Sequence, residues 1–299
     1  MNIPFIKYSK LWLTIGSLTV IICLVILVLW RLKPGIDFTG GSLLEISFST
    51  TAPTVQAIEQ QLGHKEAIIQ RTGDKGMIIR TRFLTEEEHQ AMLQKLRSSF
   101  SSTDSSVREE RFETIGGAVS NQLRQRAFWS VIMVSLGIIL YLTYAFRKVS
   151  RPVVSWKYGL MAVIAMIHDI ILVLGVFAVL GHFWGVEVDI AFVVALLTVL
   201  GYSVNDTIVV YDRIRENLLH RSANDFAGVV NNGLNETLTR SLNTTLTVLL
   251  PLFALYFVGG STVHYFALAL LIGMASGAYS SIFIASPLLV MAERWQRRA

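Results

Sequence analysis

The chain has 299 residues, of which 53% are hydrophobic and only 16% carry a charge. Soluble proteins usually contain about a quarter charged residues, so this composition indicates a membrane protein. The net charge of +5 does not indicate nucleic-acid binding, because the basic residues lie at the ends of apolar runs, as they do in membrane proteins. The single cysteine, Cys23, excludes an intramolecular disulfide, so an external domain has to be stable without one.

Six apolar runs predict six transmembrane helices, since about twenty residues of helix cross a bilayer core. The runs are 11–30, 128–146, 158–180, 190–210, 242–258 and 265–291. The first run follows Lys7 and Lys10, as a signal peptide would, but it is longer than a signal core and no small-residue cleavage site follows it. We therefore expect a retained anchor. The predicted organisation is an N-terminus and first helix over 1–30, an external domain over 31–126, helices two to six over 127–291 with loops at 147–157 and 211–241, and a tail over 292–299.

The basic residues of the short segments predict the orientation. They are Lys7 and Lys10 before the first run, Arg147, Lys148, Arg151 and Lys157 after the second, Arg213, Arg215, Arg221 and Arg240 after the fourth, and Arg294, Arg297 and Arg298 after the sixth. The loops 181–189 and 259–264 contain neither Lys nor Arg. The positive-inside rule therefore predicts that both termini and the loops 147–157 and 211–241 are cytoplasmic, and that residues 31–126 are external.

The external region predicts a small α/β domain. Strands are expected at 43–48, 67–70, 77–81 and 107–113, with a turn over the Gly-Asp-Lys-Gly sequence of residues 73–76. One helix is expected at 53–62 and another after Thr85, which has the capping-box spacing with Glu88. The order β-α-β-β-α-β is typical of a ferredoxin-like module.

Polar residues interrupt the fourth run, where each ionisable group needs a functional or structural reason. The residues whose spacing predicts one shared face are Thr198, Tyr202, Asn205, Asp206 and Val209. Asp206 precedes Asp212, at the predicted end of the helix, by roughly 9 Å of helix, which is far for a short side chain to reach the headgroups. A membrane-embedded proton-binding role is therefore favoured over a helix-end carboxylate.

Two further positions are candidates for proton transfer. Arg240 begins a stripe that continues with Asn243, Thr244 and Thr247; it is either an interfacial residue that snorkels or a basic group that faces the bundle interior. His168 and Asp169 lie near the middle of the third run, where a carboxylate beside an imidazole suits a proton relay. The alternative is a hydrogen-bonded pair that locks the third helix to its neighbours. Consecutive helical residues point about 100° apart, so these two cannot share one partner.

The sixth run carries a small residue at every fourth position, which predicts close helix packing. These residues are Ala269, Gly273, Gly277 and Ser281. The sequence contains no phosphate-binding glycine motif, metal-ligand spacing or nucleophile–base pair, so we expect neither an enzyme nor a bound cofactor or metal. The glycine-rich residues 35–41 precede a predicted strand, which does not fit dinucleotide binding.

Two motifs resemble those of the SecD/SecF protein-export family. The first is Gly35-Ile36-Asp37-Phe38-Thr39-Gly40-Gly41 after the first span, and the second is residues 201–217, Gly-Tyr-Ser-Val-Asn-Asp-Thr-Ile-Val-Val-Tyr-Asp-Arg-Ile-Arg-Glu-Asn. His168-Asp169 also matches, and the resemblance covers essentially the whole chain. The short external domain favours the SecF branch over SecD and over fused SecDF chains.

The resemblance implies a bacterial inner-membrane protein with residues 31–126 in the periplasm. It implies partnership with SecD, and through it with the SecYEG channel, YajC and the YidC insertase, acting on unfolded polypeptide after the SecA-driven step. It also implies a fold similar to half of a resistance-nodulation-division transporter, driven by the proton gradient. Carried over by motif, Asp206 is the carboxylate of the proton path and Arg240 its basic counterpart. The alternatives are a small-molecule/proton antiporter half of the same superfamily and a passive translocon scaffold.

Overall fold

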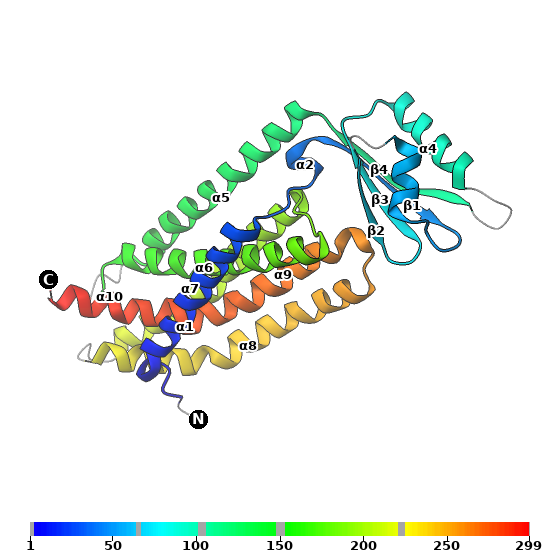
Figure 1. Ribbon diagram of the computed structural model, residues 1–299. Helices are drawn as coiled ribbons and strands as arrows, with labels where there is room; N and C mark the ends of the chain where they lie inside the picture. The colour runs from blue at the N-terminus through cyan, green and yellow to red at the C-terminus, as the bar shows by residue number, and fades with distance from the viewer. Residues whose placement is uncertain (1–2, 64–66, 101–105, 148–152, 221–224, 299) are drawn as a thin grey trace. The chain divides into compact units, whose positions relative to one another are not determined.

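A computed structural model describes residues 3–63, 67–100, 106–147, 153–220 and 225–298. The chain divides into two compact units, which are drawn in Figure 1 and described separately. One unit comprises Met1–Lys33 and Ala127–Ala299, and the other is Pro34–Arg126.

The smaller unit is built on a four-stranded antiparallel sheet. Its elements are α2 (Ile36–Thr39), β1 (Gly41–Phe48), α3 (Val55–Leu62), β2 (Ile68–Thr72), β3 (Gly76–Thr81), α4 (Glu86–Phe100) and β4 (Val107–Ile115). The strand order is β2-β3-β1-β4, and β1 pairs with both β3 and β4. This confirms the predicted β-α-β-β-α-β order and the ferredoxin-like topology.

Alternation along β1 explains how this sheet acquires a core. Leu44, Ile46 and Phe48 are buried and alternate with partly exposed residues, so every second side chain points to the same face. Ile58 of α3 and Leu96 of α4 are fully buried in the same cluster. The helices therefore cover one face of the sheet, and the unit is stabilised by this apolar layer without a disulfide.

The glycine-rich segment 35–41 differs from the prediction in one respect. It was expected only to precede a strand, but Gly35 is the N-cap residue of the single helical turn α2 before β1 starts at Gly41. Gly40 and Gly41 both have positive φ, 74° and 114°, a region that L side chains rarely adopt. A Cβ at Gly41 would lie 2.5 Å from the carbonyl oxygen of Thr81. The glycine pair therefore lets β1 start in close contact with the end of β3.

The capping box of α4 is confirmed. The backbone N–H of Thr85 donates to Glu88 Oε2 at 2.9 Å, and the N–H of Glu88 donates to Thr85 Oγ1 at 3.4 Å. The first of these bonds, together with the Arg82 guanidinium, holds the pKa of the Glu88 carboxyl below its usual value.

Replacing Thr85 with Ala is expected to loosen the first turn of α4 by about 1 kcal/mol, because one N–H loses its cap. Acid should also loosen this turn in the wild-type protein. A carboxyl group with a lowered pKa stabilises the fold above its ordinary pKa, and this contribution is lost as the pH falls from that ordinary pKa through the lowered pKa of the folded state. Hydrogen exchange of the α4 amides in the full chain measures both effects. Equal protection of this turn in both proteins would contradict the capping role.

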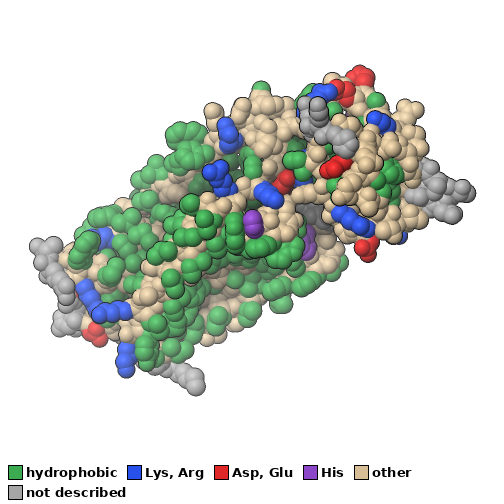
Figure 2. All heavy atoms as spheres, in the orientation of Figure 1, with side chains coloured by type: hydrophobic (Ala, Val, Ile, Leu, Met, Phe, Trp, Pro, Cys, Tyr) green, Lys and Arg blue, Asp and Glu red, His purple; other side chains and the backbone are tan. Residues whose placement is uncertain are grey.

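The larger unit contains the membrane helices. They are α1 (Ser9–Trp30), α5 (Gly117–Ala145), α6 (Ser155–Trp184), α7 (Ile190–His220), α8 (Phe226–Val258) and a sixth, composite helix. The sixth consists of α9 (Ser261–Ser280), the π-helical turn η3 (Ser281–Ala285) and α10 (Ser286–Arg298). Within the described residues, six helices are long and apolar enough to cross a membrane, as predicted. Figure 2 shows the apolar side chains that cover the visible face of these helices.

The helices extend beyond the apolar runs. Residues 211–241 were predicted as a loop, but α7 continues to His220 and α8 already begins at Phe226. These extensions carry apolar residues at helical spacing among charged ones. The buried ones include Tyr211, Ile214 and Phe226. A hydropathy run marks only the lipid-embedded part of such a helix. The predicted loop residues 148–152 and 221–224 lie outside the described part of the chain.

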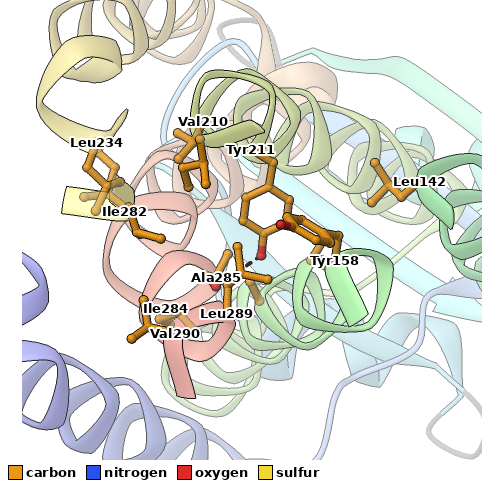
Figure 3. Packing of buried hydrophobic residues seen from close by; sticks show 14 of the residues in the cluster. Leu142, Tyr158, Val210, Tyr211, Leu234, Ile282, Ile284, Ala285, Leu289 and Val290 are labelled. Atoms are coloured by element: carbon orange, nitrogen blue, oxygen red, sulfur yellow. Dashed lines mark hydrogen bonds between the residues drawn. The ribbon is translucent and has the colours of Figure 1, made fainter. Parts of the chain in front are cut away.

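The core of this unit lies among α6, α7 and the sixth helix. Tyr158 of α6 and Tyr211 of α7 are fully buried, with ring centroids 5.4 Å apart in an edge-to-face arrangement. The Tyr211 hydroxyl donates to the Ala285 carbonyl at 3.1 Å, which supplies a partner inside the π-helical turn (Figure 3). By contrast, α1, α5 and α8 bury few of their residues and form the outer helices.

The segment before α1 is fixed to α8 by two asparagines. The N–H of Ile3 donates to Asn235 Oδ1 at 2.7 Å, and the N–H of Ile6 donates to Asn231 Oδ1 at 3.2 Å. Both amide groups also donate to the Ile3 carbonyl. Phe5 and Ile6 are buried as a result, so these hydrogen bonds hold the start of the chain against the bundle.

Candidate functional site

Asp206 lies on α7 with its carboxyl group turned into the bundle. The side chain is 4% exposed, and its Oδ2 is buried without a hydrogen-bond partner among the described residues. The Ser241 hydroxyl of α8 is a neighbour of this carboxyl group and is itself buried without a hydrogen-bond partner among the described residues. A buried carboxyl group with an unpartnered oxygen is costly in its charged form.

Arg240 and Asn205 do not join Asp206 in one pocket. Arg240 is exposed on α8, and no ion pair between it and Asp206 occurs in the described structure. Because Arg240 precedes Ser241, it nevertheless lies at the level of Asp206 along the helix pair. Asn205 is exposed on the outer side of α7. The predicted shared face for Asn205 and Asp206 is therefore wrong, because adjacent helical residues point about 100° apart.

Polar residues form two stripes on α8, and only one was predicted. The outer stripe is exposed and consists of Arg240, Asn243, Thr244 and Thr247. The inner stripe is buried and consists of Thr237, Ser241 and Thr245. Thr245 accepts a hydrogen bond from the Tyr202 hydroxyl of α7 at 3.5 Å, so the inner stripe faces α7. Its spacing of four residues was available in the sequence and is the signal that could have identified it.

Asp169 is the centre of a separate buried cluster. Its side chain is fully buried and accepts three serine hydroxyl hydrogen bonds, from Ser203 at 2.7 Å, Ser276 at 2.6 Å and Ser280 at 2.7 Å. Nδ1 of His168 lies 3.1 Å from Asp169 Oδ1. Three helices, α6, α7 and α9, thus converge on one carboxyl group.

None of the three serines was predicted as a partner of Asp169. Ser276 and Ser280 are four residues apart on α9, which is a detectable pattern. Nothing in the sequence pairs them with α6, however, because that pairing depends on how the helices pack.

The small residues of the sixth helix lie against α7. A Cβ at Gly277 would come within 3.0 Å of Ser203 Cα, and a Cβ at Gly273 would collide with Val199. Ala269 is fully buried, and the Ser281 hydroxyl lies 2.8 Å from that of Thr207. This close approach brings Ser276 and Ser280 within reach of Asp169.

The comparisons with known proteins agree with this architecture. The family model described as protein export membrane protein SecD/SecF, C-terminal, matches residues 95–295, and the SecD/SecF GG motif matches residues 31–52. The protein translocase subunit SecF of Thermobaculum terrenum is 43% identical, covering 96% of this chain and 93% of the relative. That of Synechocystis is 36% identical, covering 99% and 96%.

A solved structure covers the whole chain. The crystal structure of SecDF, a translocon-associated membrane protein from Thermus thermophilus, aligns with a TM-score of 0.80 at 32% identity. It covers 100% of this chain, which spans only 39% of the SecDF chain. A second SecDF structure, in a super-membrane-facing form, aligns with a TM-score of 0.66.

The six membrane helices and the family match together define a multi-pass membrane protein that belongs to the protein-transport machinery. The chain belongs to the SecD/SecF family, and its similar curated relatives are SecF subunits of the protein translocase.

Proposed function

We propose that the chain acts with SecD to convert the proton-motive force into assistance for protein export through SecYEG, after the SecA-driven step. This proposal depends on one observation, the burial of the Asp206 carboxyl group with an unpartnered Oδ2. A carboxyl group that is buried with an unpartnered oxygen changes its proton affinity whenever its hydration or a nearby charge changes. Arg240, next to the Ser241 that faces Asp206, is the charge that would change position.

The energy available is sufficient for such a device. A proton that crosses a potential of 100 mV releases about 2.3 kcal/mol, which shifts a two-state equilibrium by about 50-fold. Movement of the external unit between two states would bring Arg240 toward Asp206 or away from it. The external unit would then hold or release an emerging polypeptide. Export assistance, rather than a chemical reaction, is the proposed output.

SecD is the proposed covering partner of the outer polar stripe. Arg240 and Asn243 on α8 and Asn205 on α7 are exposed on helices apolar enough to span a membrane. Polar side chains in contact with lipid are unfavourable, so a neighbouring protein helix is expected to cover them. SecYEG, YajC and YidC are proposed as the wider assembly. The proposed location is the bacterial inner membrane, with both termini cytoplasmic and residues 31–126 in the periplasm.

Copurification tests this partnership. The tagged full chain, extracted from its own membrane in mild detergent, is expected to recover a SecD-type chain and the translocon. Asn243→Leu should weaken recovery roughly fivefold, because an interhelical hydrogen bond contributes about 1 kcal/mol. Thr14→Leu, a matched polar-to-leucine change at an exposed position of α1, should have no effect. Equal recovery with both variants would reject this face as the contact.

Two other functions make different predictions. A small-molecule antiporter half would change drug efflux when the chain is deleted, and a passive scaffold would conduct no protons. A passive scaffold gives no role to a buried carboxyl group with an unpartnered oxygen. A proton-coupled antiporter would use the same group, and the similarity to SecF subunits favours export over antiport.

A further inference from the structure

An ionised Asp169 places a negative charge in the interior of the bundle. Asp169 is 0% exposed, and in the described residues the imidazole of His168 is the only group that can form an ion pair with it. Three hydroxyl groups stabilise the carboxylate but leave its net charge unchanged. A fully buried net charge is strongly unfavourable, so a group that neutralises the charge of Asp169 would stabilise the helix bundle.

The tautomer of His168 follows from an ionised Asp169. A carboxylate only accepts, so each serine hydroxyl donates to it. Nδ1 of His168 then carries the proton of its hydrogen bond to Oδ1. This leaves Nε2 as a bare acceptor, and it is buried without a partner in the described structure.

We propose that His168 and Asp169 form a second proton-binding site, separate from Asp206, that takes up one proton at Nε2 of His168. The proton comes from water and converts imidazole to imidazolium, so the dyad changes from a net charge of −1 to neutral. No bond breaks within the dyad, and the serine hydroxyl groups continue to donate to Asp169. The site therefore has hydrogen bonds suited to both states of charge.

The side of His168 that faces α1 supplies a neighbour for the added N–H. The ring of Tyr279 lies 6.2 Å from that of His168, centroid to centroid, and its hydroxyl is also buried without a partner. We assign the Tyr279 hydroxyl as the acceptor of the added N–H, because it is the buried unpartnered group on the ring nearest to His168. Gly16 of α1 makes this side compact, because a Cβ there would lie 2.9 Å from Ile284 Cδ1 and 3.8 Å from His168 Cδ2.

The other titratable groups near the dyad are few. On α7, Asp206 follows Ser203 by one helical turn, and on α9 the group is Tyr279. The inner face of α1 presents Trp12 and Gly16, which do not titrate, and the buried thiol of Cys23, which packs against Gly175 about two helical turns from His168. The turn η3 carries no ionisable side chain. On α10 the buried carboxyl group is Glu293. Asp169 is therefore the negative group that acts directly on the imidazole.

The use of this proton in transport rests on the proposed function, but its binding does not. The test is ¹⁵N-histidine NMR of the full chain in lipid nanodiscs across a pH series, with the His168 signals identified by their absence in His168→Gln. Acid is expected to protonate Nε2 in the wild-type protein. Asp169→Asn should require about tenfold more protons for half-occupancy, because the stabilising negative charge is lost.

Two isosteric variants keep the test decisive if Asp169→Asn does not fold. Tyr279→Phe should raise the proton concentration needed roughly tenfold to a hundredfold, because a hydrogen bond to a charged group is lost. Tyr202→Phe, which removes a hydroxyl bonded to Thr245 instead, should leave the titration unchanged. An Nε2 signal that stays in one state wherever the chain is folded, or one indifferent to Tyr279→Phe, would overturn the proposal. Asp206→Asn should leave this titration intact, which separates it from the test of export.

Discussion

Replacing Asp206 with Asn is expected to abolish the potential-dependent part of protein export while the chain still folds and assembles. Asparagine has nearly the same shape as aspartic acid but cannot gain or lose a proton. Asp206 is buried with an unpartnered Oδ2, so the neutral amide should be tolerated where a fixed charge would not be. The measurement is export of a secretory protein into inverted membrane vesicles, with and without a membrane potential.

The matched control is Asp212→Asn on the same helix. Asp212 is exposed and pairs with Arg215 at 3.3 Å, so its loss removes only a surface ion pair that contributes little. Export with this variant should retain its full dependence on the potential. If Asp206→Asn exported as the wild type does, Asp206 would be a packing residue, and the passive scaffold would become the better account.

Replacing Gly41 with Ala is expected to unfold the start of β1. Alanine at a φ of 114° is strained by about 1–3 kcal/mol, and its Cβ would lie 2.5 Å from a backbone carbonyl of β3 that cannot rotate away. The pairing of β1 with both β3 and β4 should weaken, because β1 lies between them in the sheet. Hydrogen exchange of the β1 amides and limited proteolysis of the full chain measure this change.

Gly73→Ala is the control that tests the strain of a positive φ without a collision of the added Cβ. Gly73 also has a positive φ, 65°, but a Cβ there would meet no atom within 4 Å. Its loss of protection should therefore be much smaller and confined to the β2–β3 turn. Similar losses in the two variants would mean that close packing at the glycine pair is unimportant.

The parts predicted correctly from the sequence are those that local patterns determine. Apolar length determined the six helices, because a bilayer requires about twenty residues of helix. Two-residue alternation and turn residues determined the strands, and the Thr85–Glu88 spacing identified a real cap. The helical extension over residues 211–220 was missed because its apolar positions are interrupted by charges.

The candidate site was predicted less completely, because packing determines which side chains meet. Periodicity grouped Asn205 with Asp206, yet one is exposed and the other buried, since the packing of α7 against its neighbours sets the boundary between them. Asp169 was visible as an unusual residue, but its serine partners come from α7 and α9. No local pattern specifies contacts between helices that are distant in the sequence.

The π-helical turn η3 divides the sixth helix into two halves with independent registers. One surplus residue rotates everything after Ala285 by about 100° relative to a continuous α-helix. The half before it presents Ser276 and Ser280 to Asp169, and the half after it directs Leu289 to the layer around Tyr211. Loss of that residue would keep the helix intact but put the two surfaces out of phase, so only one could stay docked. This short segment therefore sets the angular relation between the polar interior of the bundle and its aromatic end.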